Sequence, residues 1–265
     1  MLLRPHTKIA PLVALALCAP TLAQENVLDD ADAERSVELV RSWRDETSQF
    51  LVELGSIESP SGQEHERAAR VADEMRRIGL GDVRITGSPN VIGRIPGREE
   101  GATVFVSTLD DLRTVVEHQR ARGGPPTIEG DRIIGPGTNT SSTTAAMLTA
   151  ARALIEVGIE PLHDIVFVAV AQEETGLVGM RDLYDEYEGL AREYIDVLGD
   201  GRRISFGALG IHWWRVIAAG PPGHTLRGGL PNTNLGIARA VDRILGLPHP
   251  EQFSDSNTRI NIAML

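Results

Sequence analysis

Two adjacent glutamates follow the most apolar segment of the chain and have the clearest potential for chemistry. Glu173 and Glu174 lie just beyond residues 164–171, whose sequence DIVFVAVA is typical of a strand buried on both faces. Two neighbouring carboxylates at such a position repel each other unless a cation or a proton separates them. One could bind a metal ion while the other takes a proton from metal-bound water. The alternative is an exposed acidic turn that precedes a helix.

Acidic residues also follow two other predicted strands. Asp110 and Asp111 come after the apolar run 104–107, and Asp200 follows the run 194–198. In α/β folds, functional groups gather just beyond the carboxyl ends of the strands. The loop 135–140 follows a short apolar pair at 133–134 and is expected at the same edge. The spacing therefore predicts one acidic site assembled from several strand ends.

The elements that must position this site alternate between strands and helices. This alternation predicts an α/β fold with a mostly parallel sheet flanked by helices. Ser61 is placed to cap the second helix, with Glu64 three residues later. After Gly210 the pattern becomes that of a second, smaller α+β domain. The predicted helices are 33–54, 64–78, 110–122, 141–157, 176–187 and 234–245, and the predicted strands are 83–86, 90–95, 104–109, 133–134, 164–171, 194–198, 211–219 and 259–265.

The N-terminus has the features of an export signal. Arg4 and Lys8 precede an apolar run that is too short to anchor a protein in a bilayer. Thr21 and Ala23 are small residues suited to cleavage after Ala23. A lipid anchor on Cys18 is the alternative. Residues 1–23 are therefore predicted to be a cleaved signal peptide.

The amino-acid composition excludes thiol chemistry and argues against two classes of partner. Cys18 is the only cysteine, so the cleaved chain would have no disulfide, thiol nucleophile or thiolate metal ligand. The net charge of −11 argues against nucleic acid and anionic membranes as partners, because both require clustered Lys and Arg. With the signal peptide, this composition predicts a periplasmic or secreted protein that has no membrane partner after cleavage.

Six stretches of the chain, in order, resemble the zinc-dependent superfamily of aminoacylases, glutamate carboxypeptidases and succinyl-diaminopimelate desuccinylases, known as the M-twenty peptidases. They span residues 45–265. The resemblance implies a catalytic-type α/β domain over 24–209 and part of a lid or dimerisation domain over 210–265. The stretches are SIESPSGQEHERAARVADEMRRIGL, VFVSTLDDL, GDRIIGPGTNTSSTTAAMLTAARAL, DIVFVAVAQEETGLVGM, DVLGDG and AAGPPGHT.

The resemblance also implies roles for individual residues. Glu173 corresponds to the general base, and lid-domain His224 to a histidine that holds the substrate carbonyl. Glu174 and Asp200 correspond to metal ligands, with Asp196 as a rival to Asp200. Asp110 corresponds to the aspartate that orients a histidine ligand, and it is a candidate metal ligand itself because that histidine is replaced. The implied cofactor is a divalent metal, zinc above all, with manganese or cobalt as alternatives.

Two positions depart from the family pattern. Thr108 stands where the family has a histidine ligand, and Thr140 where it has the aspartate that bridges both metals. The family's last histidine ligand would lie beyond residue 265. The remaining carboxylates form an all-oxygen set, which suits Mg, Mn or Ca better than zinc, and a chain without metal is the alternative. His118 could swing towards the site, but such a residue more often faces solvent.

Three interpretations follow from this pattern. The first is an exported metal-dependent hydrolase of amide or peptide bonds, acting on small peptides or N-acyl amino acids. The second is an inactive relative that binds a peptide or a partner without turnover, and the third is a truncated fragment. The resemblance also implies a homodimer formed through the lid domain.

Overall fold

The computed structural model describes residues 31–199, 204–205, 210, 214–224, 226, 228–248 and 262, apart from the side chain of Arg122. The predicted signal peptide, Asp200 and the predicted strand 259–265, except Ile262, lie outside the described residues. The chain divides into two compact units, within residues 1–202 and 203–265. No helix of the described residues combines the length and apolar character that a membrane span needs.

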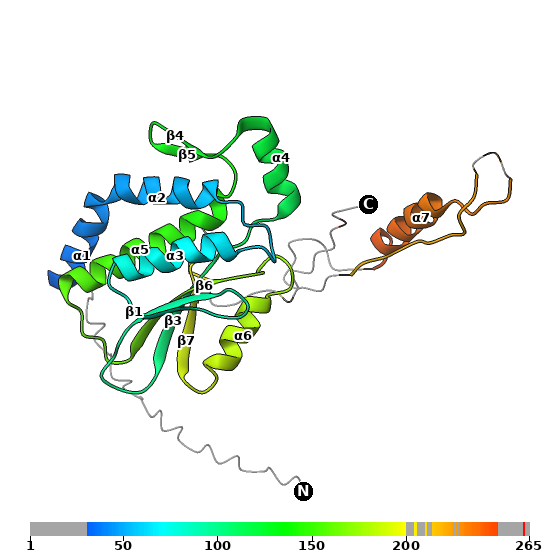
Figure 1. Cartoon of the computed structure of the whole chain (residues 1–265). Coiled ribbons are helices and arrows are strands. Elements are labelled where there is room, and N and C mark those ends of the chain that lie inside the picture. Colours follow the sequence, from blue (N-terminus) through cyan, green and yellow to red (C-terminus); the bar gives the residue numbers. More distant parts are fainter. Residues whose placement is uncertain are drawn as a thin grey trace, which may run out of the picture. The chain divides into compact units, whose positions relative to one another are not determined.

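The first unit contains a five-stranded mixed sheet, which confirms the predicted α/β fold (Figure 1). Strands β6, β3 and β7 run parallel, whereas β2 pairs antiparallel with β6 and β1 pairs antiparallel with β2. The strand order is β1 (Gly81–Ile85), β2 (Val91–Ile95), β6 (Asp164–Val170), β3 (Ala102–Thr108) and β7 (Ala191–Asp196).

Helices cover both faces of the sheet. Figure 1 shows α3 (His65–Arg77) and α5 (Thr138–Val157) on one face and α6 (Val178–Glu186) on the other. On the α3–α5 side, Met75 and Leu148 pack against Phe167, with α1 (Ala31–Ser42) and α2 (Arg44–Ser56) lying against α5. On the other face, Leu183 of α6 packs against the valines of β3 and β6. These two cores hold the ends of β3 and β6 in place.

The structure corrects several predicted elements. The predicted helix 33–54 is two helices, α1 and α2, separated at Trp43. The predicted strand 133–134 does not join the central sheet: β5 (Arg132–Ile134) pairs only with β4 (Thr127–Glu129), in an exposed hairpin that follows α4 (Arg113–Gly123). Only three residues long and facing solvent, β5 has too little apolar surface to enter the core.

The second unit contains α7 (Thr233–Leu245), which begins at Asn232. The Asn232 side chain accepts a hydrogen bond from the Leu235 amide at 2.9 Å, as an N-cap residue does. The described part of the predicted strand 211–219, which is 214–219, is not a strand. Trp214 is 88% exposed. An exposed segment with no described pairing partner lacks both the hydrogen bonds and the packing that make a strand.

Candidate functional site

Asp110 lies at the carboxyl edge of the sheet, where the sequence predicts the site, and it is completely buried. The parallel register pairs Thr108 at the end of β3 with Val170 at the end of β6, so the two following loops leave the sheet together. Asp110 Oδ1 accepts hydrogen bonds from Thr108 Oγ1 at 2.8 Å and from the Glu173 amide at 2.9 Å. Its Oδ2 accepts from Ser61 Oγ at 2.5 Å and from the Glu174 amide at 3.1 Å. A carboxylate has about four acceptor positions, and four donors of this chain use them.

Asp111 is the second buried aspartate at this edge, and a buried arginine neutralises it. Arg67 Nη2 of α3 lies 2.6 Å from Asp111 Oδ2, and both side chains are 1% exposed. Asp111 Oδ1 accepts a hydrogen bond from Thr140 Oγ1 at 2.7 Å. Neither Asp111 nor Arg67 was assigned a role from sequence. The charge pattern Asp-Asp was visible, but nothing in the sequence indicated which cation would face it.

Both threonines at the substituted ligand positions are buried, and each donates its hydroxyl proton to an aspartate. Thr108 donates to Asp110, and Thr140 donates to Asp111. Thr140 reaches the site because α5 starts beneath the strand ends. Thr144, one turn further along, donates to the Thr108 carbonyl oxygen at 3.0 Å. Thr108 and Thr140, the threonines at the substituted ligand positions, thus belong to one hydrogen-bonded network.

Ser61 has a different role from the predicted helix cap. Helix α3 begins after Glu64, which makes no capping hydrogen bond through its side chain, and Ser61 donates to Asp110 instead. The loop that contains Ser61 runs beside the end of β3, since the Asp111 amide donates to the Ser59 carbonyl oxygen at 2.8 Å. Ser61 therefore belongs to the site.

A strained turn brings the amides of Glu173 and Glu174 to Asp110. Gln172, the second residue after β6, has φ of 53°, in the left-handed region that most side chains avoid. Asn90, a buried residue that the sequence did not single out, secures the turn on both sides. Its Oδ1 accepts from the Ala171 amide at 2.9 Å, and its Nδ2 donates to the Gly179 carbonyl oxygen at 2.8 Å. A side chain at position 179 would collide with Asn90, since a Cβ there would lie 2.2 Å from Oδ1.

The side chains of Glu173 and Glu174 accept no hydrogen bond from a described residue, and both are partly buried. Burial raises the pKa of Glu173 to about 7, and the charges of Glu174, Asp110 and Asp196 add to the effect. Burial, with the charges of Asp110 and Asp111, also raises the pKa of Glu174. Perturbed carboxyls of this kind are common at functional sites. Asp196, the rival to Asp200, is therefore close enough to Glu173 to act on its charge.

The structure does not test the roles of the other predicted site residues. Asp200 lies outside the described residues. His224 belongs to the second unit, where its Nδ1 accepts from the Leu226 amide at 3.2 Å. His118 on α4 is exposed. Their assigned roles stay predictions.

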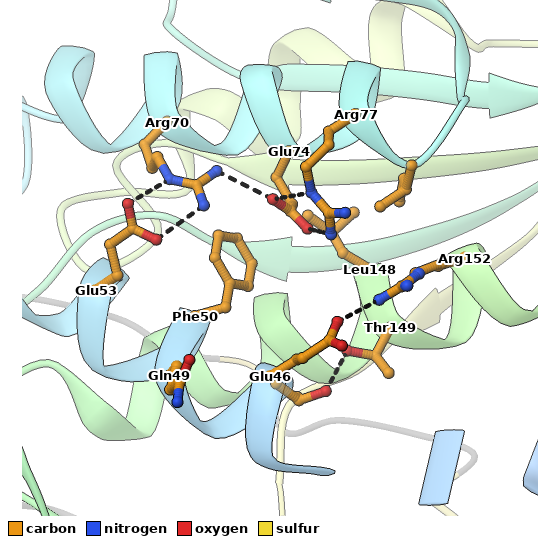
Figure 2. A pocket seen from close by; sticks show the side chains of 12 residues that line it. Glu46, Gln49, Phe50, Glu53, Arg70, Glu74, Arg77, Leu148, Thr149 and Arg152 are labelled. Carbon is orange, nitrogen blue, oxygen red and sulfur yellow. Dashed lines mark hydrogen bonds and ion pairs between the residues drawn. The ribbon is translucent and has the colours of Figure 1, made fainter. Parts of the chain in front are cut away.

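The helical layer holds a separate pocket of about 220 Å³ between α2, α3 and α5 (Figure 2). Arg70, Arg77 and Arg152 line it, and each is paired with a glutamate. Glu74 binds both Arg70 and Arg77, which together keep its pKa low against the opposing effect of burial. No predicted site residue lines this pocket, and its charges are satisfied internally.

The chain is similar to several proteins that are described as peptidases. A model of Peptidase family M28 matches residues 90–197. Carboxypeptidase G2 of Pseudomonas sp. (strain RS-16) is 27% identical over 257 residues, covering 91% of this chain and 59% of that protein. Human carnosine dipeptidase 1 shares the fold with a TM-score of 0.52 and 19% identity, over 62% of this chain and 40% of its own. The Bacillus subtilis YXEP protein, described as a dinuclear metal-binding peptidase of the M20 family, gives a TM-score of 0.44 and 18% identity, over 57% and 42%.

These matches support the resemblance of the chain to the zinc-peptidase superfamily. The sequence motifs resemble the M-twenty peptidases, whereas the matching family model is that of Peptidase family M28 and covers less than half of the chain. The chain spans about three-fifths of the length of carboxypeptidase G2. The activity, substrate and partners assigned to the whole protein are therefore proposals.

The described residues do not fit the metal pair that the superfamily implies. No three His, Cys, Asp or Glu side chains of the described part are arranged to hold one metal ion. Asp110 has all its acceptor positions filled, and Asp111 is paired with Arg67. Thr108 and Thr140 offer only neutral hydroxyls, already engaged as donors. The hydrogen bonds thus favour a structural role for Asp110 over its predicted role as a metal ligand.

Proposed function

We propose that this chain is a peptide-binding relative of the zinc peptidases that does not hydrolyse its ligand by a two-metal route. One observation carries the proposal: the four acceptor positions of Asp110 are filled by donors of the protein itself. A metal ion could bind Asp110 only by displacing at least one donor. Each hydrogen bond to a charged group contributes about 1.5–3 kcal/mol, and zinc would gain no imidazole or thiolate in return.

The charge of the site indicates which ligand it would accept. Glu173 and Glu174 are partly exposed and have no described donor, so their oxygens are available to a ligand. Their negative charge, with Asp196 nearby, favours the ammonium group of a peptide N-terminus. The same charge disfavours an N-acyl amino acid, which has a carboxylate and no cation. A small peptide with a free N-terminus is therefore the better ligand of the two predicted.

Binding and turnover of matched ligands test this proposal. The purified chain is incubated with zinc, manganese or cobalt, dialysed and analysed for metal, then titrated with a dipeptide and with the same dipeptide N-acetylated. We expect less than one metal per chain, binding of the free dipeptide that weakens on acetylation, and no cleavage of either. A Glu173→Gln, Glu174→Gln double variant should lose the preference for the free amine. Two tightly held metals with peptide cleavage would contradict the proposal.

A second candidate is hydrolysis, and the raised pKa of Glu173 favours it. A carboxyl with a pKa of about 7 is half-ionised near neutral pH, which suits a general base. This candidate requires a metal held by Glu174 with Asp196 or Asp200. It predicts cleavage of a dipeptide or an N-acyl amino acid that depends on added metal and is abolished in Glu173→Gln. Metal-dependent cleavage unaffected by that variant would reject Glu173 as the base.

We also propose that the protein is exported to the periplasm or secreted and that it forms a dimer. Export is supported by the basic start, short apolar run and small residues before position 24. N-terminal sequencing of protein from the producing cell tests it, with Gln24 as the expected first residue. The dimer is supported only by the resemblance of the second unit to a lid domain, and light scattering of the purified protein tests it.

A further inference from the structure

Arg67 is a buried cation that joins three parts of the first unit. Its Nη2 binds Asp111 Oδ2 and also donates to the Ile57 carbonyl oxygen at the end of α2, at 2.6 Å. Its Nη1 donates to the Leu109 carbonyl oxygen, just beyond β3, at 2.8 Å. An arginine from α3 therefore links the end of α2 to the end of β3.

The turn before α5 closes over this ion pair. Gly137 has φ of 71°, and a Cβ at that position would lie 3.3 Å from both Arg67 Nη2 and Asp111 Oδ2. Thr140, in the first turn of α5, donates a hydrogen bond to the other carboxylate oxygen of Asp111. The backbone packs so closely that even a methyl group would be tight, and the pair is sealed from water. An unpaired charge in such a place would be strongly destabilising.

Asp110, next to Asp111, is stabilised differently. Its donors are two hydroxyls and two backbone amides, none of which is charged. They come from the Ser61 loop, from β3 and from the turn after β6. The two aspartates thus connect α2, α3, α5, β3 and the turn after β6, which are the elements that form the carboxyl edge of the sheet.

We propose that Arg67 and the hydroxyls of Ser61, Thr108 and Thr140 hold these buried aspartates in place without any metal ion. The Arg67 side chain then supplies the positive charge at the carboxyl edge of the sheet, and folding of the first unit does not require metal. This proposal rests on the proposed function in one respect, because both require that no metal ion binds Asp110 or Asp111.

Thermal unfolding of the full chain, with EDTA and with excess zinc or manganese, is the first test. We expect Tm to stay within about 1 °C in all three conditions. A metal present at a hundredfold excess over its dissociation constant would raise Tm by roughly 5–10 °C in a protein of this size. A rise of that order, or a fall in Tm on chelation, would overturn the proposal.

Arg67→Met is the second test, with Arg76→Met as its matched control. Arg76 lies on the same helix and pairs with Asp73 at the surface. Arg67→Met should lower Tm by roughly 10 °C, because Asp111 keeps its charge without a partner. Arg76→Met should change Tm by about 2 °C or less. Equal effects of the two substitutions would overturn the proposal.

Adding Asp111→Asn to Arg67→Met separates loss of the ion pair from general damage. Removing the stranded charge should recover a substantial part of the lost Tm, or restore cooperative unfolding if the single variant does not fold. A double variant no better than Arg67→Met would refute the role of the charge pair. None of these measurements involves a peptide, so failure of peptide binding leaves their result intact.

Discussion

Glu173→Gln is expected to stabilise the protein at pH 8 and to leave its stability unchanged near pH 4. Burial and three neighbouring carboxylates raise the pKa of Glu173 from its usual 4.5 to about 7. The folded state therefore binds the Glu173 proton more tightly than the unfolded state does. Below pH 4.5 both states are protonated and no penalty exists. Stability decreases as the pH rises from 4.5 to 7, and the full penalty persists above pH 7.

The magnitude follows from the size of this shift. A shift of 2.5 pH units corresponds to about 3.4 kcal/mol, since one unit is worth 1.36 kcal/mol. Glu173 is only partly buried, and solvent screening reduces the effect to about 1–2 kcal/mol. The neutral glutamine is free of this penalty. Its Tm at pH 8 should therefore exceed that of the unaltered chain by about 2–8 °C.

Differential scanning calorimetry at pH 4, 6 and 8 measures the effect. Glu188→Gln is the control, because Glu188 is exposed and makes no ion pair with a described residue. The control should shift Tm equally at the three pH values, by about 1 °C or less. A Glu173→Gln variant that is less stable than the unaltered chain at pH 8 would refute the reasoning, because it would mean that a cation or donor stabilises the ionised carboxylate.

Three further variants test the network around the aspartates. The double variant Thr108→His, Thr140→Asp should have a Tm that rises by roughly 5–10 °C at saturating zinc, because an imidazole and a third carboxylate are then present at the carboxyl edge of the sheet. A Tm that does not change with zinc would show that Asp110 remains closed to metal. Ser61→Ala should lower the free energy of unfolding by about 1–3 kcal/mol in urea denaturation, because Asp110 loses a donor, and a change below 0.5 kcal/mol would contradict this. Asn90→Ala should cost about 2–3 kcal/mol in the same assay, because the Ala171 amide and Gly179 carbonyl lose their partner; full stability would mean that the turn needs no such brace.

The alternation of apolar runs and amphipathic segments was sufficient to predict the α/β fold. The valine-rich runs of β3 and β6 predict strands inside the sheet that are covered on both faces, because both faces of each run carry apolar residues. The strand-end rule then located Asp110, Glu173 and Glu174 correctly at one edge. The hairpin β4–β5 and the break at Trp43 were missed, since short apolar pairs and a continuous helical spacing do not reveal exposure or a change in direction.

The sequence by itself determined which residue types stand at the ends of the strands, and it showed that two positions expected to hold metal ligands are threonines. Only the tertiary structure decided what those threonines do. Arg67 lies 44 residues before Asp111, and Thr140 lies 29 residues after it, so no local pattern could pair them. Burial removes the water that would otherwise solvate the two aspartates, and each must then find donors within the fold. That requirement, imposed by packing, brings a cation and three hydroxyls to an edge where the sequence alone indicated only negative charge.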